Sequence, residues 1–320
     1  MYIAQAFNVL HEWWRYLVGV VLVIIGVTIG QIPLAIAVFY ESFKEDVNIK
    51  GMNEANMMSL LEPNLGLFLM LLSFAAGLFT LLLVAKYLHK QSVVHLTTSR
   101  EKIDWKRFWF VFFVWGIISS SFVVVDYVMS PENYVYNFKL IPFLILCVIA
   151  IIFVPLQTSF EEYLFRGYLM QGLGVIFKNK WVPLITTSLV FGLLHIANPE
   201  VEKLGYIIMI YYIGTGLFLG IMTLMDEGME LSLGFHAANN LFTVLLVTAD
   251  WTAFQSHSIL KDMSDPTEMA LSEIILPVFI IFPVLLLILS KIYGWTNWKE
   301  KLFGKITEPS TTNLKIENEL

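Results

Sequence analysis

The sequence has 320 residues, of which 57% are apolar and 14% are charged. Soluble domains carry about 25% charged residues, so this composition excludes an ordinary soluble protein. The net charge of -6 comes with no basic stripe, which excludes a nucleic-acid partner, and the single cysteine, Cys147, excludes a disulfide framework or a thiolate metal cluster.

Long charge-free windows follow one another along the chain. In chain order they are Leu17–Tyr40, Leu65–Ala85, Phe108–Val125, Leu140–Phe160, Trp181–Pro199, Leu204–Met225, Leu231–Ala249 and Ile274–Ser290. About 20 mostly apolar residues suffice to cross a bilayer as a helix. The pattern therefore predicts an all-α, polytopic integral membrane bundle of about eight transmembrane helices, preceded by an interfacial segment.

The basic residues indicate an orientation. If the two termini lie on the same side of the membrane, that side holds most of the 20 Lys and Arg residues, including the six between residues 86 and 107. Because Lys and Arg concentrate in cytoplasmic loops, we expect both termini in the cytoplasm.

Three ionisable residues interrupt the apolar pattern after Phe160. Glu162 and Arg166 are four residues apart, so on a helix they can pair, whereas Glu161 points roughly 100° away. One carboxylate is thus neutralised and the other is free for general acid or base work. A structural clasp is the alternative explanation of the pair.

Two histidines fall inside apolar windows further along the chain. His195 ends one apolar run, and His236 lies four residues before Asn240, so these two share a helix face and can donate hydrogen bonds to an oxyanion. If Lys178–Lys180 is the tip of a helical hairpin, Glu161 and His195 lie at the same height. We therefore expect the helix that carries Glu161 to continue to Phe177. A lone histidine in such a place is otherwise an ordinary interfacial residue.

Together these residues form three ordered motifs. They are Glu-Glu-x-x-x-Arg at residues 161–166, Phe-x-x-x-His at residues 191–195 and His-x-x-x-Asn at residues 236–240. In this respect the sequence resembles the family of CAAX prenyl proteases and bacteriocin-processing proteins, also called the CPBP or Abi family. The resemblance covers roughly residues 140–250.

The resemblance implies an intramembrane endopeptidase in a bacterial plasma membrane. Glu161 and His195 would activate the attacking water, Glu162 and Arg166 would orient the motif, and His236 and Asn240 would stabilise the oxyanion. Glu161, His195 and His236 are also a legitimate zinc set. There is no His-Glu-x-x-His helix, so we expect a metal-independent mechanism and keep zinc as the alternative.

The same reasoning divides the chain and limits its partners. We expect three N-terminal spans in residues 1–139, a catalytic core in 140–250, a last loop and span in 251–290 and a polar cytoplasmic tail in 291–320. The expected partners are the lipid bilayer and a peptide or membrane-protein substrate, and the sequence leaves the oligomeric state open. Two alternatives to a protease are a non-catalytic scaffold or immunity protein and a proton-coupled transporter; the transporter is disfavoured because no second half repeats the polar pattern.

Overall fold

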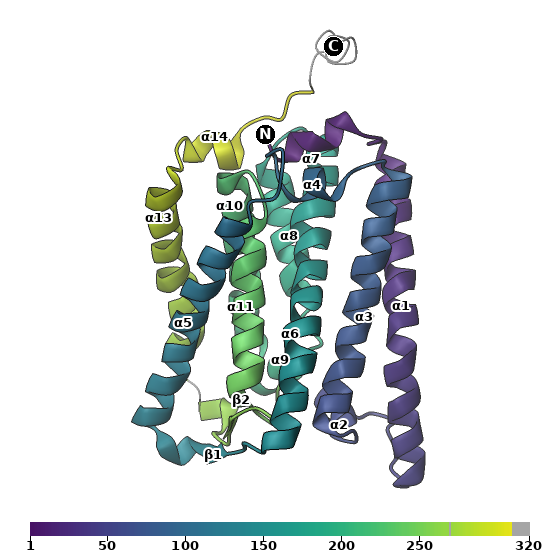
Figure 1. The fold of residues 1–320 in the computed structure, drawn as a ribbon, viewed down its shortest axis with the longest axis vertical. Helices are drawn as coiled ribbons and strands as arrows, with labels where there is room; N and C mark the ends of the chain where they lie inside the picture. The colour runs from purple at the N-terminus through teal and green to yellow at the C-terminus, as the bar shows by residue number, and fades with distance from the viewer. Residues whose placement is uncertain (269, 309–320) are drawn as a thin grey trace.

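A computed structural model describes residues 1–268 and 270–308 and shows long helices standing side by side (Figure 1). By length and composition, six helical segments can cross a membrane: Trp13–Lys44, Pro63–Leu88, Trp105–Met129, Leu140–Phe177, Tyr206–Asp226 and Leu271–Tyr293. The two remaining charge-free windows form the shorter helices α8 (Trp181–Leu193) and α11 (Glu230–Leu246). The predicted polytopic helical membrane bundle is confirmed.

The other elements are as follows. The longer α-helices are α1 (Trp13–Lys44), α3 (Pro63–Leu83), α5 (Trp105–Met129), α6 (Leu140–Glu162), α10 (Met209–Asp226) and α13 (Phe282–Tyr293). The short ones are α2 (Glu54–Met58), α4 (Val93–Thr97), α7 (Met170–Phe177), α9 (Pro199–Leu204), α12 (Leu271–Leu276) and α14 (Trp298–Phe303). Turns of 3₁₀-helix are η1 (Ile3–Asn8), η3 (Pro131–Asn133), η5 (Tyr206–Ile208) and η6 (Pro266–Glu268), and π-helical turns are η2 (Val84–Leu88), η4 (Tyr163–Leu169) and η7 (Pro277–Ile281).

The helix that carries Glu161 continues as predicted. α6, η4 and α7 form one helical segment from Leu140 to Phe177, which ends where Lys178 adopts a left-handed conformation with φ 52°. α8 begins at Trp181, so the predicted hairpin is confirmed. The π-helical turn η4 lies directly after Glu162 and contains Arg166; such turns occur frequently at functional sites.

Helix α11 lies at the centre of the bundle. It packs against α5 on one side and α6 on another, while α1 pairs with α3, and α10 with α8 (Figure 1). The first nine residues of α11, 230–238, are all buried. By contrast, α1 exposes large apolar side chains such as Ile24, Ile36 and Phe39, which is typical of a surface that faces lipid.

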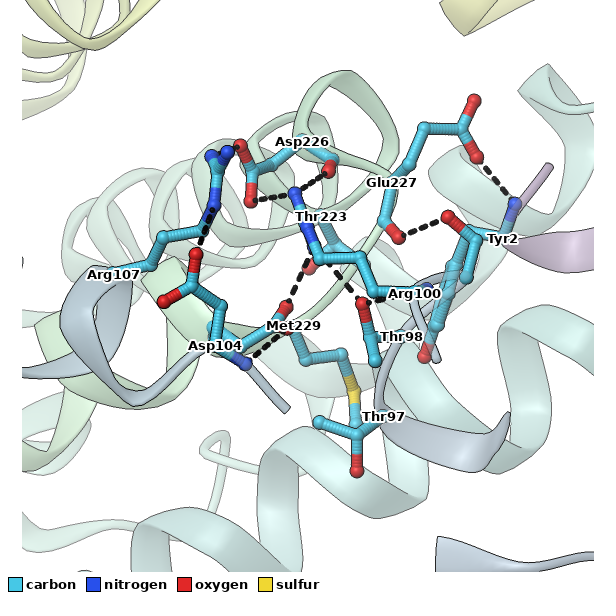
Figure 2. Close-up of polar contacts among 12 residues, drawn as sticks. Tyr2, Thr97, Thr98, Arg100, Asp104, Arg107, Thr223, Asp226, Glu227 and Met229 are labelled. Carbon is cyan, nitrogen blue, oxygen red and sulfur yellow. Dashed lines mark hydrogen bonds and ion pairs between the residues drawn. The ribbon is translucent and has the colours of Figure 1, made fainter. Parts of the chain in front are cut away.

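A polar clasp ties the elements together at the end of the bundle where the N-terminal segment and α14 lie (Figures 1 and 2). Arg100, in the loop before α5, pairs with Asp226 at 3.0 Å and with Glu230 at 3.1 Å, and Arg107 pairs with the same Asp226. Asp226 and Glu230 are buried, so these cations stabilise charges that would otherwise be costly. The clasp therefore fixes the turn between α10 and α11.

The side chains of the clasp pack closely against the glycine in the turn between α10 and α11. A Cβ atom at Gly228 would lie 2.2 Å from Oε2 of Glu230 and 2.7 Å from Nη1 of Arg100. Beside it, Glu227 accepts hydrogen bonds from the backbone N–H of Tyr2 and from Lys301. The N-terminal segment and α14 are thereby joined to the same turn.

A small sheet lies at the opposite end of the bundle (Figure 1). β3 (Leu260–Asp262) pairs antiparallel with β1 (Tyr134–Tyr136) and parallel with β2 (Val247–Thr248). The strands are two or three residues long, too short for a sequence pattern to indicate them.

The segment predicted as a polar tail begins inside a helix. α13 continues to Tyr293, and α14 follows, with Leu302 and Ile306 buried against the core. The most polar part of that tail, residues 309–320, lies outside the described residues.

Candidate active site

The predicted site residues gather around a cavity of about 530 Å³ inside the bundle, here called the central cavity. Glu161, His195, His236 and Asn240 line it. Side chains of α1 and α3 also contribute to its wall, namely Val27, Gln31, Met70, Ser73 and Phe74. Helices outside the motif-bearing region therefore help to build the cavity, which no sequence motif indicated.

Glu162 and Arg166 lie behind the cavity wall and form the predicted ion pair. The Arg166 Nη1 atom donates to Oε1 of Glu162 at 2.9 Å, and both side chains are 0% exposed. The Nη2 atom donates to the Gly216 carbonyl at 3.0 Å, and the guanidinium stacks over the Phe191 ring, with 4.5 Å to the centroid. The pair therefore connects η4 to α8 and α10 from a fully buried position.

His236 lies between the two adjacent carboxylates. Its Nδ1 atom is 2.8 Å from Oε1 of Glu162, and its Nε2 atom is 3.4 Å from Oε2 of Glu161. A carboxylate paired with arginine can only accept hydrogen bonds, so Nδ1 carries a hydrogen. Nε2 is then the ring nitrogen that can exchange a proton with Glu161.

His195 lines the same cavity as Glu161 but makes its own contacts. Its Nδ1 atom bonds to the Phe191 carbonyl at 2.8 Å, and its ring stacks on Tyr212 with centroids 4.4 Å apart. Among the described residues, Glu161 pairs with His236 and not with His195. The bond at Nδ1 leaves Nε2 of His195 as the nitrogen available to water or substrate.

Asn240 belongs to a chain of amide side chains. It donates to Gln157 Oε1 at 3.0 Å and accepts from Asn239 at 3.1 Å, and Asn239 in turn accepts from the Trp115 indole N–H at 3.1 Å. This chain fixes the orientation of the Asn240 amide and leaves one of its two N–H hydrogens without a partner in the chain. Sequence reasoning had not assigned roles to Asn239, Gln157 or Trp115, although Gln157 lies one turn before Glu161.

The arrangement of the donor atoms decides whether a zinc ion fits the site. Across residues 1–268 and 270–308, no group of three or more His, Cys, Asp or Glu side chains is arranged to hold a metal ion. Both ring nitrogens of His236 already face carboxylates. The set of Glu161, His195 and His236 does not fit a zinc ion in this arrangement.

Comparison with known proteins agrees with the geometry. A family profile described as type II CAAX prenyl endopeptidase, Rce1-like, matches residues 137–242, a stretch that contains all six predicted site residues. A protein of Bacillus subtilis strain 168, the uncharacterized protein YyaK, is 30% identical over 239 residues, which cover 73% of this chain and 78% of YyaK. The chain belongs to the Rce1-like CAAX protease family. No solved structure matches this Rce1-like chain.

The buried ion pair of this Rce1-like protein yields a stability prediction. Arg166→Met leaves the Glu162 carboxylate buried without its cation, so it should lower the free energy of unfolding by about 3–5 kcal/mol. SDS titration in mixed micelles measures this quantity. The Glu162→Gln/Arg166→Met double variant should recover most of the loss, because the remaining groups carry no unpaired charge.

Lys44→Met is a suitable control, because Lys44 pairs with Glu41 at the surface and its loss should leave stability unchanged. An Arg166→Met variant as stable as the wild type would show that the pair does not hold η4 in place.

Proposed function

We propose that this Rce1-like protein is an intramembrane endopeptidase that hydrolyses a peptide bond in a membrane-associated protein or peptide precursor. The observation that supports it best is the placement of His236 between Glu161 and Glu162 at the wall of a cavity inside the bundle. In this proposal residues 140–250 form the catalytic core.

Glu161 acts as the general base. A water molecule beside its carboxylate and Nε2 of His195 gives a proton to Glu161 as its oxygen attacks the carbonyl carbon of the substrate. Glu162, neutralised by Arg166, holds the His236 ring, so that Nε2 of His236 stays next to Glu161.

The oxyanion is stabilised by hydrogen bonds from α11. The unused N–H of Asn240 and, in its protonated form, Nε2 of His236 donate to the oxygen that becomes negative. The C–N bond then breaks, and the proton held by Glu161 passes to the leaving nitrogen, so an acid and an amine are released.

The proposed orientation places the catalytic groups in the membrane with the far end of the cavity outside the cell. The central cavity extends from Glu161 to the loop after α11, residues 247–254, which lies at the end of the bundle opposite the N-terminal segment and α14 (Figure 1). With both termini in the cytoplasm of a bacterial plasma membrane, substrates reach the site from the extracytoplasmic side.

The proposed chemistry predicts that Glu161→Gln abolishes cleavage while the protein still folds. Loss of a general base costs about 10²–10⁴-fold in rate, and Glu161 is partly exposed to the cavity, so its neutralisation leaves no buried ion unpaired. The measurement is mass spectrometry of a peptide library incubated with detergent-solubilised protein, together with the melting temperature.

Glu132→Gln changes an exposed carboxylate outside the cavity and should cleave like the wild type. If Glu161→Gln retains wild-type cleavage, or if it retains the cellular phenotype of the wild-type gene, the proposed protease mechanism is wrong and a non-catalytic scaffold is favoured.

The orientation is tested by labelling. In a background in which Cys147 is replaced by alanine, Asp250→Cys should react with a membrane-impermeant maleimide in intact cells, since Asp250 is an exposed residue of the loop 247–254. Lys299→Cys, exposed on α14 at the other end, should react only after the cells are permeabilised. The reverse pattern would place the loop in the cytoplasm.

A further inference from the structure

The acidic and basic residues that line the central cavity are unevenly distributed: carboxylates are present, and Lys and Arg are absent from its described lining. Its lining contains the carboxylates of Glu161, Glu200 and Asp262, and among the described lining residues there is no Lys or Arg. Carboxylates in a cleft with apolar walls focus a negative potential there. The proposed chemistry uses Glu161, but it assigns no role to Glu200.

One carboxylate oxygen of Glu200 accepts a hydrogen bond, and the other has no partner in the described structure. The residue lies on α9, five residues after His195, and its Oε1 atom accepts the backbone N–H of Ala253 at 2.9 Å. Its Oε2 atom is buried and has no hydrogen-bond partner in the described structure. Burial raises the pKa of this carboxyl, so a cation bound beside it would stabilise its charged form.

A second cavity residue on the facing loop is also unsatisfied. The indole N–H of Trp251 is buried without a hydrogen-bond partner, and Trp251 lies two residues before Ala253, which holds Glu200. An unsatisfied buried donor and an unsatisfied buried acceptor are both costly, so a ligand in the cavity that pairs with them gains binding free energy. The missing partners are a cation or N–H donor for Glu200 and a carbonyl oxygen for Trp251.

We propose that Glu200 and Trp251 form a specificity subsite that binds a positively charged group of the substrate peptide, together with a neighbouring backbone carbonyl. The charged group is a Lys or Arg side chain or an amino-terminal ammonium. This inference rests on the proposed function for the nature of the ligand, a peptide, but the subsite itself lies beyond the catalytic residues.

Binding of a peptide library tests the subsite without cleavage. The protein carries Glu161→Gln to prevent turnover, and the probe is a randomised twelve-residue peptide library prepared in two forms, with free and with acetylated amino termini. Peptides retained by the detergent-solubilised protein are sequenced by mass spectrometry. We expect enrichment of Lys and Arg at one position, or of free over acetylated termini, and the two forms of the library distinguish these sources of charge.

Glu200→Gln in the same background should reduce that enrichment about tenfold to a hundredfold, the usual effect of one hydrogen bond to a charged group. Glu202→Gln is the matched control: it lies on the same helix, bonds to Asn53 at the surface and does not line the cavity, so it should retain the enrichment.

Two results would overturn the inference. One is a bound pool without enrichment of positive charge, and the other is an enrichment that persists in Glu200→Gln. The proposed function fails separately: a protein with Glu161 intact that binds basic peptides through Glu200 but cleaves none of them is not a protease, and the subsite would still stand.

Discussion

The arrangement of this site depends on the buried pair between Glu162 and Arg166. An isolated charge at this depth costs several kcal/mol, so each partner requires the other. The pair also makes hydrogen bonds to two other helices: Arg166 donates to a carbonyl of α10, and Glu162 accepts from His236 of α11. One ion pair thus links three helices at the height of the central cavity, and the π-helical turn η4 provides the backbone that brings Arg166 to it.

Because Glu162 is occupied in this way, the two adjacent glutamates have different environments. Glu162 is fully buried and paired with a cation, whereas Glu161 reaches the cavity and faces the outer nitrogen of His236. The result is a carboxylate–imidazole–carboxylate row that ends at a space large enough for a peptide segment. At the first residue of α11, Glu230 pairs with Arg100 in the polar clasp. This contact fixes the position of α11 and therefore the position of His236 between the two glutamates.

Local spacing predicted part of this site, and interhelical packing determined the rest. The i, i+4 spacing of Glu162 and Arg166 was sufficient to predict their pair, and the hairpin at Lys178 was sufficient to place Glu161 and His195 on one cavity. Spacing does not tell which histidine on another helix contacts Glu161 directly; in the structure this histidine is His236, while His195 lines the same cavity. Trp115 and Glu200 were missed for the same reason, since their contacts come from distant segments.

The central claim is that Glu161 and His236 act as one unit, in which Glu161 takes the proton of the attacking water and His236 beside it donates to the oxyanion. A double-mutant cycle on the cleavage rate, with Glu161→Gln, His236→Ala and the double variant, tests it most directly. If the two groups act together, each single variant loses at least about a hundredfold in kcat/KM. The double variant then has about the same kcat/KM as the less active of the two single variants. Losses that multiply in the double variant would show that the two side chains act independently, which would contradict this account.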